Sequence, residues 1–296
     1  MFNKSRENQF KIYNSVRRYF LAHPEYLIKL EKYFSDKILE LLKKNLDSIV
    51  SDYNEASKLY PFWQNYPPDE RGRSPKGDQF PWIEVGEHSI GVKLIRLLAE
   101  IFKSSDPGLP TGPDQRIVLT HPIIKKMTGG LTNCIWLMID IKSTGPRDDF
   151  GHTVMSHNQI SGDGNWDKIE NGVSNTVLKA TGVRNKHLFH ATLPPIYILS
   201  DGTIAPVIIF ALKPTYKMLA LDGHSADAGQ PLKKITLISI PNGLLLTKTP
   251  GYLKKYPSLL FPGKDDRDKN PLKIRARISF DILKRIDDWR VKTLEV

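Results

Sequence analysis

The run Cys134-Ile-Trp-Leu-Met-Ile-Asp-Ile141 is apolar at every position except Asp140, and Lys142 follows it directly. A continuous apolar run of this length is typical of a central β-strand that is covered on both faces. Because side chains alternate along a strand, Asp140 and Lys142 share one face, and Ile141 points the other way into the core. A carboxylate and an ammonium at the end of a buried strand are costly unless they pair or serve a site.

The segments around this run predict both helices and strands. The chain up to about Ser57 has helical periodicity, with a break at Pro24, and a further helix is expected from Val85 to Phe102. Asn242-Gly243 is a hairpin-turn signal. Strands are expected at 116–120, 196–199, 204–212, 234–240, 244–247 and 273–280, a polar loop at 156–164, and a short closing helix at 281–289. We therefore expect one mixed α/β domain over residues 1–296, with residues 1–57 as a helical scaffold within it.

The composition narrows the class of protein. Lys and Arg number 43 against 32 Asp and Glu, which gives a formal net charge of +11. This excess of basic residues favours a polyanionic partner, nucleic acid first, although basic charge also serves solubility. A single cysteine, Cys134, excludes a disulfide framework and a thiolate metal cage. With no apolar run of membrane-spanning length, we expect a cytoplasmic protein without a membrane partner.

Carboxylates near the strand end predict a metal site. Pro113-Asp114 opens the preceding β segment, and a neighbouring strand would bring Asp114 beside Asp140. Two carboxylates there would hold Mg²⁺, which polarises a phosphodiester and activates water, while Lys142 would neutralise charge on the phosphate. Glu84 and Glu87 at the start of the preceding helix could add a further metal or water contact. The alternative, that the helix dipole favours glutamate at a helix N-terminus, is equally good for Glu84. The alternative for Asp140 and Lys142 is a structural ion pair.

Two other segments carry basic residues in unusual settings. Residues 60–82 alternate prolines and aromatic residues with Arg71, Arg73 and Lys76, which suits either a loop along a phosphate backbone or a rigid surface loop. The charged segment 261–269 contains Lys264 and Asp266, and Arg275-Ala-Arg277 follows it. Such side chains would read G·C pairs, because Lys and Arg match guanine acceptors and Asp accepts from cytosine. The alternative is a charged hairpin held by local ion pairs.

Taken together, these residues and their spacing resemble the BglI family of type II restriction endonucleases, within the PD-(D/E)xK nuclease superfamily. The resemblance spans essentially the full chain and departs mainly in the N-terminal helices and at 149–172 and 217–230. The shared blocks include Pro81-Trp-Ile-Glu-Val-Gly-Glu87, Gly108-Leu-Pro-Thr-Gly-Pro-Asp114, Asp140-Ile-Lys-Ser143, Ile198-Leu-Ser-Asp-Gly-Thr-Ile-Ala-Pro-Val207 and Pro262-Gly-Lys-Asp-Asp-Arg267.

The resemblance implies an α/β restriction-endonuclease-like fold, a mixed central β-sheet flanked by helices, acting as a homodimer on double-stranded DNA with Mg²⁺. It implies an interrupted palindrome of the GCCNNNNNGGC type, cut within the spacer, and a cognate DNA methyltransferase as a genetic partner in a prokaryotic cytoplasm. The implied catalytic residues are Asp114, Asp140, Lys142 and Glu87; the implied metal ligands are Asp114, Asp140 and Ile141; and the implied base-reading residues are Asp148, Lys264, Asp266, Arg275 and Arg277.

Two other functions fit parts of the same pattern. A non-catalytic, sequence-specific DNA-binding protein would account for the net charge of +11 and for the charged segment. It would bind DNA without cutting it in any divalent cation. A less specific repair nuclease or RNA nuclease with a similar core would cut, but would give smeared products. The conjunction of Asp114, Asp140 and Lys142 favours a nuclease over the binding protein.

Overall fold

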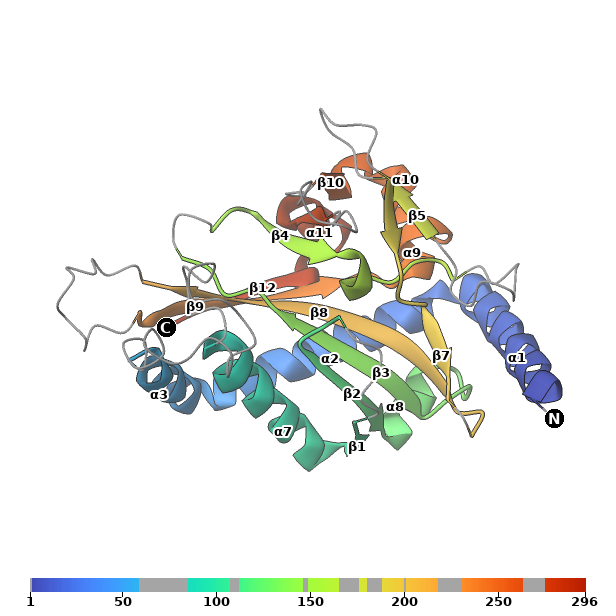
Figure 1. Ribbon diagram of the computed structural model, residues 1–296, viewed down its shortest axis with the longest axis horizontal. Helices are drawn as coiled ribbons and strands as arrows, with labels where there is room; N and C mark the ends of the chain where they lie inside the picture. The colour runs from blue at the N-terminus through green and yellow to red at the C-terminus, as the bar shows by residue number, and fades with distance from the viewer. Residues whose placement is uncertain are drawn as a thin grey trace.

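The structure is a computed structural model, and it describes residues 2–58, 85–106, 112–145, 149–164, 176–179, 188–199, 201–217, 230–262 and 275–296. A central sheet joins its strands in the order β1-β2-β3-β8-β9-β12, with β7 paired to β8 (Figure 1). β3 runs antiparallel to β2 and parallel to β8, so the expected mixed sheet is confirmed. The strands are β1 (Lys103–Ser105), β2 (Gln115–Thr120), β3 (Cys134–Ile141), β7 (Ile196–Ile198), β8 (Ile204–Tyr216), β9 (Leu232–Ile240) and β12 (Val291–Glu295).

Strand β3 lies in the middle of this sheet and is buried along its whole length. Its side chains alternate between two hydrophobic cores, one on each face of the sheet. Trp136 and Met138 belong to one core, and Leu137, Ile139 and Ile141 belong to the other. The period of two therefore carries Asp140 to the face of Trp136 and Met138 and turns Ile141 to the opposite core, as expected for Ile141.

Helices cover both faces of the sheet, and Figure 1 shows α3 and α7 on one side and α9, α10 and α11 on the other. Among the described residues, no helix is both long enough and apolar enough to cross a membrane. The helices are α1 (Phe2–Ala22), α2 (Pro24–Lys44), α3 (Leu46–Ser57), the π-helical η1 (Glu87–Gly91), α7 (Val92–Ile101), α8 (Pro122–Met127), η3 (His157–Gln159), α9 (Gly243–Thr247), α10 (Tyr252–Lys255), η5 (Pro257–Leu259), α11 (Phe280–Ile286) and η6 (Asp288–Arg290).

A smaller sheet lies over the face that carries Asp140. It joins β10 (Leu260–Pro262), β11 (Arg275–Ser279) and β4 (His152–Ser156) in antiparallel pairs. Met155, Ala276 and Ile278 from this sheet enter the same hydrophobic core as Trp136 of β3. A separate pair of strands, β5 (Thr176–Lys179) and β6 (Leu188–Ala191), completes the described β-structure. This shared core joins the smaller sheet to the face of the central sheet that carries Asp140.

The predicted strand at 244–247 and the hairpin turn before it are wrong. Residues Gly243–Thr247 form helix α9, and Asn242 caps it, because its Oδ1 accepts a hydrogen bond from Leu244 N at 3.0 Å. Asn242 has φ −53°, and neither it nor Gly243 takes the positive φ that the turn needs. Its Nδ2 also donates to the carbonyls of Pro195 and Val207, both at 2.9 Å. Long-range hydrogen bonds have therefore overridden the local turn preference of Asn-Gly.

Other boundaries differ less. The expected helix break at Pro24 is confirmed, but the following helical run is divided at Asn45, whose Nδ2 donates to Leu41 O. The predicted helices at 85–102 and 281–289 are present, each joined to a short π or 3₁₀ turn. The polar segment 156–164 contains the 3₁₀ turn η3. Strand β8 continues to Tyr216 because it keeps pairing with β9, and the edge strand β12 was not predicted.

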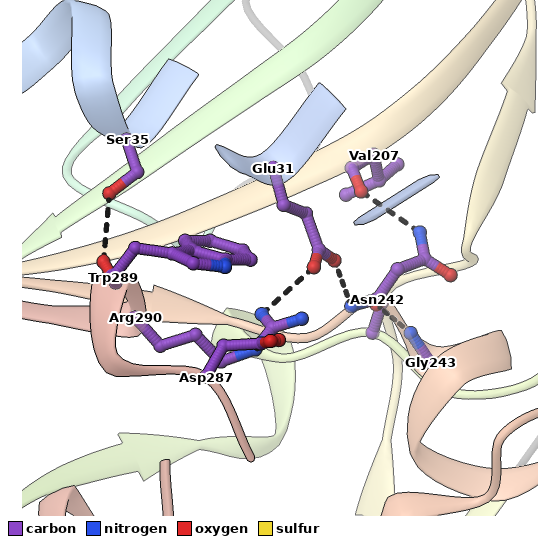
Figure 2. A network of polar contacts seen from close by, with 9 residues as sticks. Glu31, Ser35, Val207, Asn242, Gly243, Asp287, Trp289 and Arg290 are labelled. Carbon is purple, nitrogen blue, oxygen red and sulfur yellow. Dashed lines mark hydrogen bonds and ion pairs between the residues drawn. The ribbon is translucent and has the colours of Figure 1, made fainter. Parts of the chain in front are cut away.

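A buried polar network fastens α2 to the C-terminal part of the chain, and Figure 2 shows it from close by. Arg290 and Glu31 are both 0% exposed, and Arg290 Nη1 lies 2.9 Å from Glu31 Oε2. The other carboxylate oxygen accepts from Asn242 N at 2.6 Å. Asp287 pairs with Arg290 Nε at 3.2 Å, and the guanidinium stacks 4.3 Å from the Trp289 ring. Because every charge in this network has a partner, the fold tolerates its burial.

Candidate active site

Asp140 and Lys142 meet at the C-terminal end of β3. Lys142 Nζ lies 2.6 Å from Asp140 Oδ2, where the carboxylate is 0% exposed and the lysine side chain is 30% exposed. The Ile141 side chain points into the opposite core and is 2% exposed. The predicted sharing of one strand face by Asp140 and Lys142 is therefore confirmed.

Asp114 reaches the same place from the neighbouring strand. It directly precedes β2, whose first residue, Gln115, pairs with Ile139 of β3. Asp114 Oδ2 accepts a hydrogen bond from the main-chain N of Ile141 at 2.6 Å. This bond holds the Asp114 carboxylate against Ile141, the residue between Asp140 and Lys142 in the sequence. The antiparallel register thus brings together two acidic side chains that lie far apart in the sequence.

Burial raises the pKa of Asp140 to about 7, against an ordinary value of 3.8. Lys142 opposes this shift, while the negative charges of Asp114 and Glu87 add to it. Loss of water disfavours the ionised form, and two nearby carboxylates disfavour it further. A cation at this point would reverse the balance, because it would favour ionisation of Asp140.

Glu87 approaches from the opposite face of the sheet, on the π-helical turn η1. The turn lies close to the end of β3 because Gly86 has no side chain: a Cβ built there would lie 2.1 Å from Ser143 Oγ. The negative charge of Glu87 contributes to the raised pKa of Asp140. Its expected place as a supporting carboxylate is thus compatible with the structure, which does not describe Glu84.

The donor set suits a hard divalent cation. Among the residues that the structure describes, no three His, Cys, Asp or Glu side chains gather closely enough to form a metal site unaided. Mg²⁺ does not need such a cage, because it is commonly held by one or two carboxylates, with waters and substrate phosphate completing the octahedron. Asp140 Oδ2 is buried, is paired with the Lys142 ammonium, and has no hydrogen bond of acceptable geometry within the described residues. An oxygen in that state fits a metal ligand.

Gln159 belongs to the site, although the sequence predicts only a polar loop at 156–164. Its Nε2 donates to Asp140 Oδ1 at 2.5 Å, and its side chain is buried. Gln159 is also the last residue of a capping box with Ser156. The Ser-x-x-Gln spacing is a local signal for that turn. No local signal indicates that the amide would also contact Asp140.

Arg275 and Arg277 project from the outer face of β11, since Ala276 and Ile278 between and beyond them enter the core. Arg277 lies 6.0 Å from the Phe261 ring, and its Nε has no hydrogen-bond partner among the described residues. Both arginines are half-buried, on the smaller sheet that lies over the Asp140 face. Asp148, Lys264 and Asp266 lie outside the described residues, as do Arg71, Arg73 and Lys76.

Solved structures of restriction endonucleases share this fold. The crystal structure of the restriction endonuclease BglI bound to its DNA recognition sequence matches with a TM-score of 0.87 and 46% identity, covering 100% of this chain and 99% of that one. Tetrameric restriction endonuclease SfiI bound to cognate DNA matches with a TM-score of 0.51 and 17% identity, over 88% of this chain and 85% of that one. At such low identity the second match concerns the fold alone. The expected restriction-endonuclease-like fold is confirmed.

Sequence comparisons identify the family of restriction endonucleases to which the chain is similar. The profile of the family described as "Restriction endonuclease BglI" matches residues 8–294. The type II restriction enzyme BglI of Bacillus subtilis is 46% identical over 100% of this chain and 99% of its own length. The chain belongs to the restriction endonuclease BglI family, as the shared blocks predicted.

Proposed function

We propose that this chain is a Mg²⁺-dependent type II restriction endonuclease that cuts double-stranded DNA at a specific sequence. The convergence of Asp114, Asp140 and Lys142 at the end of β3 carries this proposal. Family membership and the DNA-bound structure of the 46% identical BglI support it. Residues 1–296 would act as one catalytic and DNA-recognition domain in a bacterial cytoplasm.

The chemistry follows from the groups at the strand end. Bound Mg²⁺ would polarise the scissile phosphodiester and lower the pKa of a water molecule. Asp114 and Asp140 would supply its carboxylate oxygens, and any ligation by Ile141 would come from the main chain, because the side chain lies in the core. Lys142 is partly exposed, so its ammonium can leave Asp140 to neutralise charge on the phosphate and orient the attacking water. Glu87 would support this arrangement through its charge.

Recognition would involve the smaller sheet and the segments next to it. We assign base reading to Arg275, Arg277, Asp148, Lys264 and Asp266, whose chemistry matches G·C pairs. The site would be an interrupted palindrome of the GCCNNNNNGGC type, cut within the spacer. A homodimer would match its two half-sites, and a cognate methyltransferase would protect host DNA. Backbone contacts are assigned to Arg71, Arg73 and Lys76.

Digestion of phage DNA tests this proposal. The purified protein should give discrete bands with Mg²⁺ and none with EDTA, and sequencing of the fragment ends should show the interrupted palindrome. Asp140→Ala should abolish the bands while binding to a cognate duplex persists in a gel. DNA binding without cleavage in any divalent cation would instead identify a non-catalytic DNA-binding protein. Smeared products, or a preference for RNA, would indicate a less specific nuclease.

A further inference from the structure

The Gln159 side chain joins three parts of the molecule at one amide group. Its Oε1 accepts a hydrogen bond from Ser156 N at 2.8 Å, while its Nε2 donates to Asp140 Oδ1 at 2.5 Å and to Gly112 O at 3.4 Å. The side chain is buried, so these bonds do not compete with bulk water. A buried amide with all three contacts is held in one orientation, because the reversed amide would face Ser156 N with a donor.

The contact with Asp140 distinguishes the two oxygens of that carboxylate. Oδ1 accepts from Gln159, and Oδ2 faces the Lys142 ammonium at 2.6 Å. A neutral donor on Oδ1 stabilises the ionised carboxylate without adding a charge to the site. It also fixes the rotation of the carboxylate about its final bond, so that Oδ2 stays directed toward Lys142. Hydrogen-bonded partners of metal-binding carboxylates generally have this orienting effect.

The contact with Gly112 extends the connection to Asp114. Gly112 has φ +146°, and a Cβ there would lie 2.1 Å from the carbonyl oxygen of Asn158. The turn η3 therefore packs directly against the backbone that leads through Pro113 to Asp114. Only glycine allows this approach, since any side chain would displace the turn. Gln159 thus contacts the carboxylate of Asp140 directly, and the main chain of Gly112, two residues before Asp114.

The third contact leads to the predicted base-reading strand. Ser156, the donor to Gln159 Oε1, is the last residue of β4 and pairs with Arg275 in the antiparallel register of β4 and β11. Arg277 follows on the same face of β11 and pairs with Val154. A displacement of β11 on binding DNA would therefore reach Asp140 through one side chain.

We propose that Gln159 is a positioning residue for DNA cleavage, which orients Asp140 and connects both site carboxylates to the strand that carries Arg275 and Arg277. The inference rests on the proposed nuclease function and deepens it. Gln159 does not touch the scissile phosphate in this scheme; it acts through Asp140.

The experiment compares Gln159→Met with Thr192→Val. Methionine has a similar length and is apolar, but it removes the donor to Asp140 and Gly112 and the acceptor for Ser156 N. Thr192 Oγ1 donates to His157 O of the same turn at 3.2 Å, so its replacement by valine removes one bond from η3 without touching Asp140. Three quantities are measured for each protein: the single-turnover cleavage rate with Mg²⁺, the affinity for Mn²⁺ alone by electron paramagnetic resonance, and cognate-duplex binding in EDTA.

For Gln159→Met we expect the cleavage rate and the Mn²⁺ affinity to fall by about 10- to 100-fold each. Losses of this size are usual when a residue that hydrogen-bonds a metal ligand is replaced. Duplex binding in EDTA should stay within about threefold of the wild type, less than 1 kcal/mol. Thr192→Val should leave cleavage, metal affinity and DNA binding close to wild type. Equal losses in both variants, or unchanged Mn²⁺ affinity in Gln159→Met, would overturn the proposal.

Gln159→Glu provides a second variant if methionine disturbs folding. Glutamate keeps an acceptor for Ser156 N, and with it the turn, but places a second oxygen against Asp140 Oδ1. Cleavage at pH 8 should again fall by at least about tenfold; wild-type cleavage in this variant would overturn the proposal. If the wild-type protein itself fails to cut DNA, the proposed function fails, whereas the Mn²⁺ comparison still decides the role of Gln159.

Discussion

Replacing Asp140 by asparagine should stabilise the metal-free protein above neutral pH while it abolishes cleavage. Burial raises the pKa of this carboxyl group from 3.8 to about 7, so the folded protein holds a proton that the unfolded chain has released. A group whose pKa is raised on folding lowers stability as the pH rises from the unfolded value to the folded one. Asparagine has nearly the same shape and carries no charge, so it removes this cost.

The magnitude follows from the shift. A difference of about three pKa units corresponds to about 4 kcal/mol once the pH exceeds 7, and to about two fifths of that at pH 5. This value already contains the attraction of Lys142. It is an upper limit, because both oxygens of Asp140 face donors, Gln159 Nε2 and Lys142 Nζ, and the amide nitrogen of asparagine would face one of them. We expect a net gain of about 2 kcal/mol at pH 8. With about 2 cal/mol/K of unfolding entropy per residue, the gain would raise the Tm by about 3 °C.

Urea unfolding in EDTA at pH 8 and at pH 5 measures this gain. Asp36→Asn is the control, because its carboxylate is half exposed on α2 and pairs only with Lys32 at 2.5 Å among the described contacts. It should change stability by less than about 1 kcal/mol at either pH. The reasoning fails if Asp140→Asn unfolds at the wild-type urea concentration at pH 8, or if its gain is the same at both pH values.

Three further substitutions, and one control, test recognition and packing. Arg277→Ala should cost about 1–3 kcal/mol for the cognate duplex in a titration and relax discrimination at one base pair; equal weakening on random DNA would make it a phosphate contact. Lys76→Ala should weaken cognate and random DNA alike and reduce the slope of log K against log salt by about one, and an unchanged slope would exclude a backbone contact. Glu31→Ala should destabilise the protein by about 3–5 kcal/mol in urea, because it removes the fully buried anion of Arg290 and leaves only the partly exposed Asp287 beside it. Asp36→Ala at an exposed pair should cost less than about 1 kcal/mol. Similar losses in these last two variants would contradict that reading of the buried network.

Local patterns were sufficient for the middle of the sheet. The continuous apolar run from Cys134 to Ile141 is typical of a strand covered on both faces, and the period of two places Asp140 and Lys142 together. The position of Asp114 at the start of the neighbouring strand follows from the antiparallel pairing of β2 with β3. These parts of the site depend on residues close together in sequence, or on one strand pairing.

Asn242 illustrates why other parts of the fold could not be predicted from local sequence patterns. Asn-Gly favours a hairpin in isolation, but the Asn242 side chain bonds the carbonyls of Pro195 and Val207 and caps α9. Those partners are distant in sequence, and their bonds outweigh a local preference of modest size. Within the site, Gln159 likewise bonds a residue that is distant in sequence, Asp140, and no local pattern indicates that bond.

The sequence alone determined the central strand, the charged pair at its end and membership of the BglI family, because periodicity, burial and shared blocks are properties of the chain itself. Only the tertiary structure decided that Gln159 bonds Asp140, that Glu87 approaches from the far face, and that burial raises the pKa of Asp140 to about 7. The physical reason is that hydrogen bonds and desolvation depend on which distant segments pack together. That packing is a property of the whole fold.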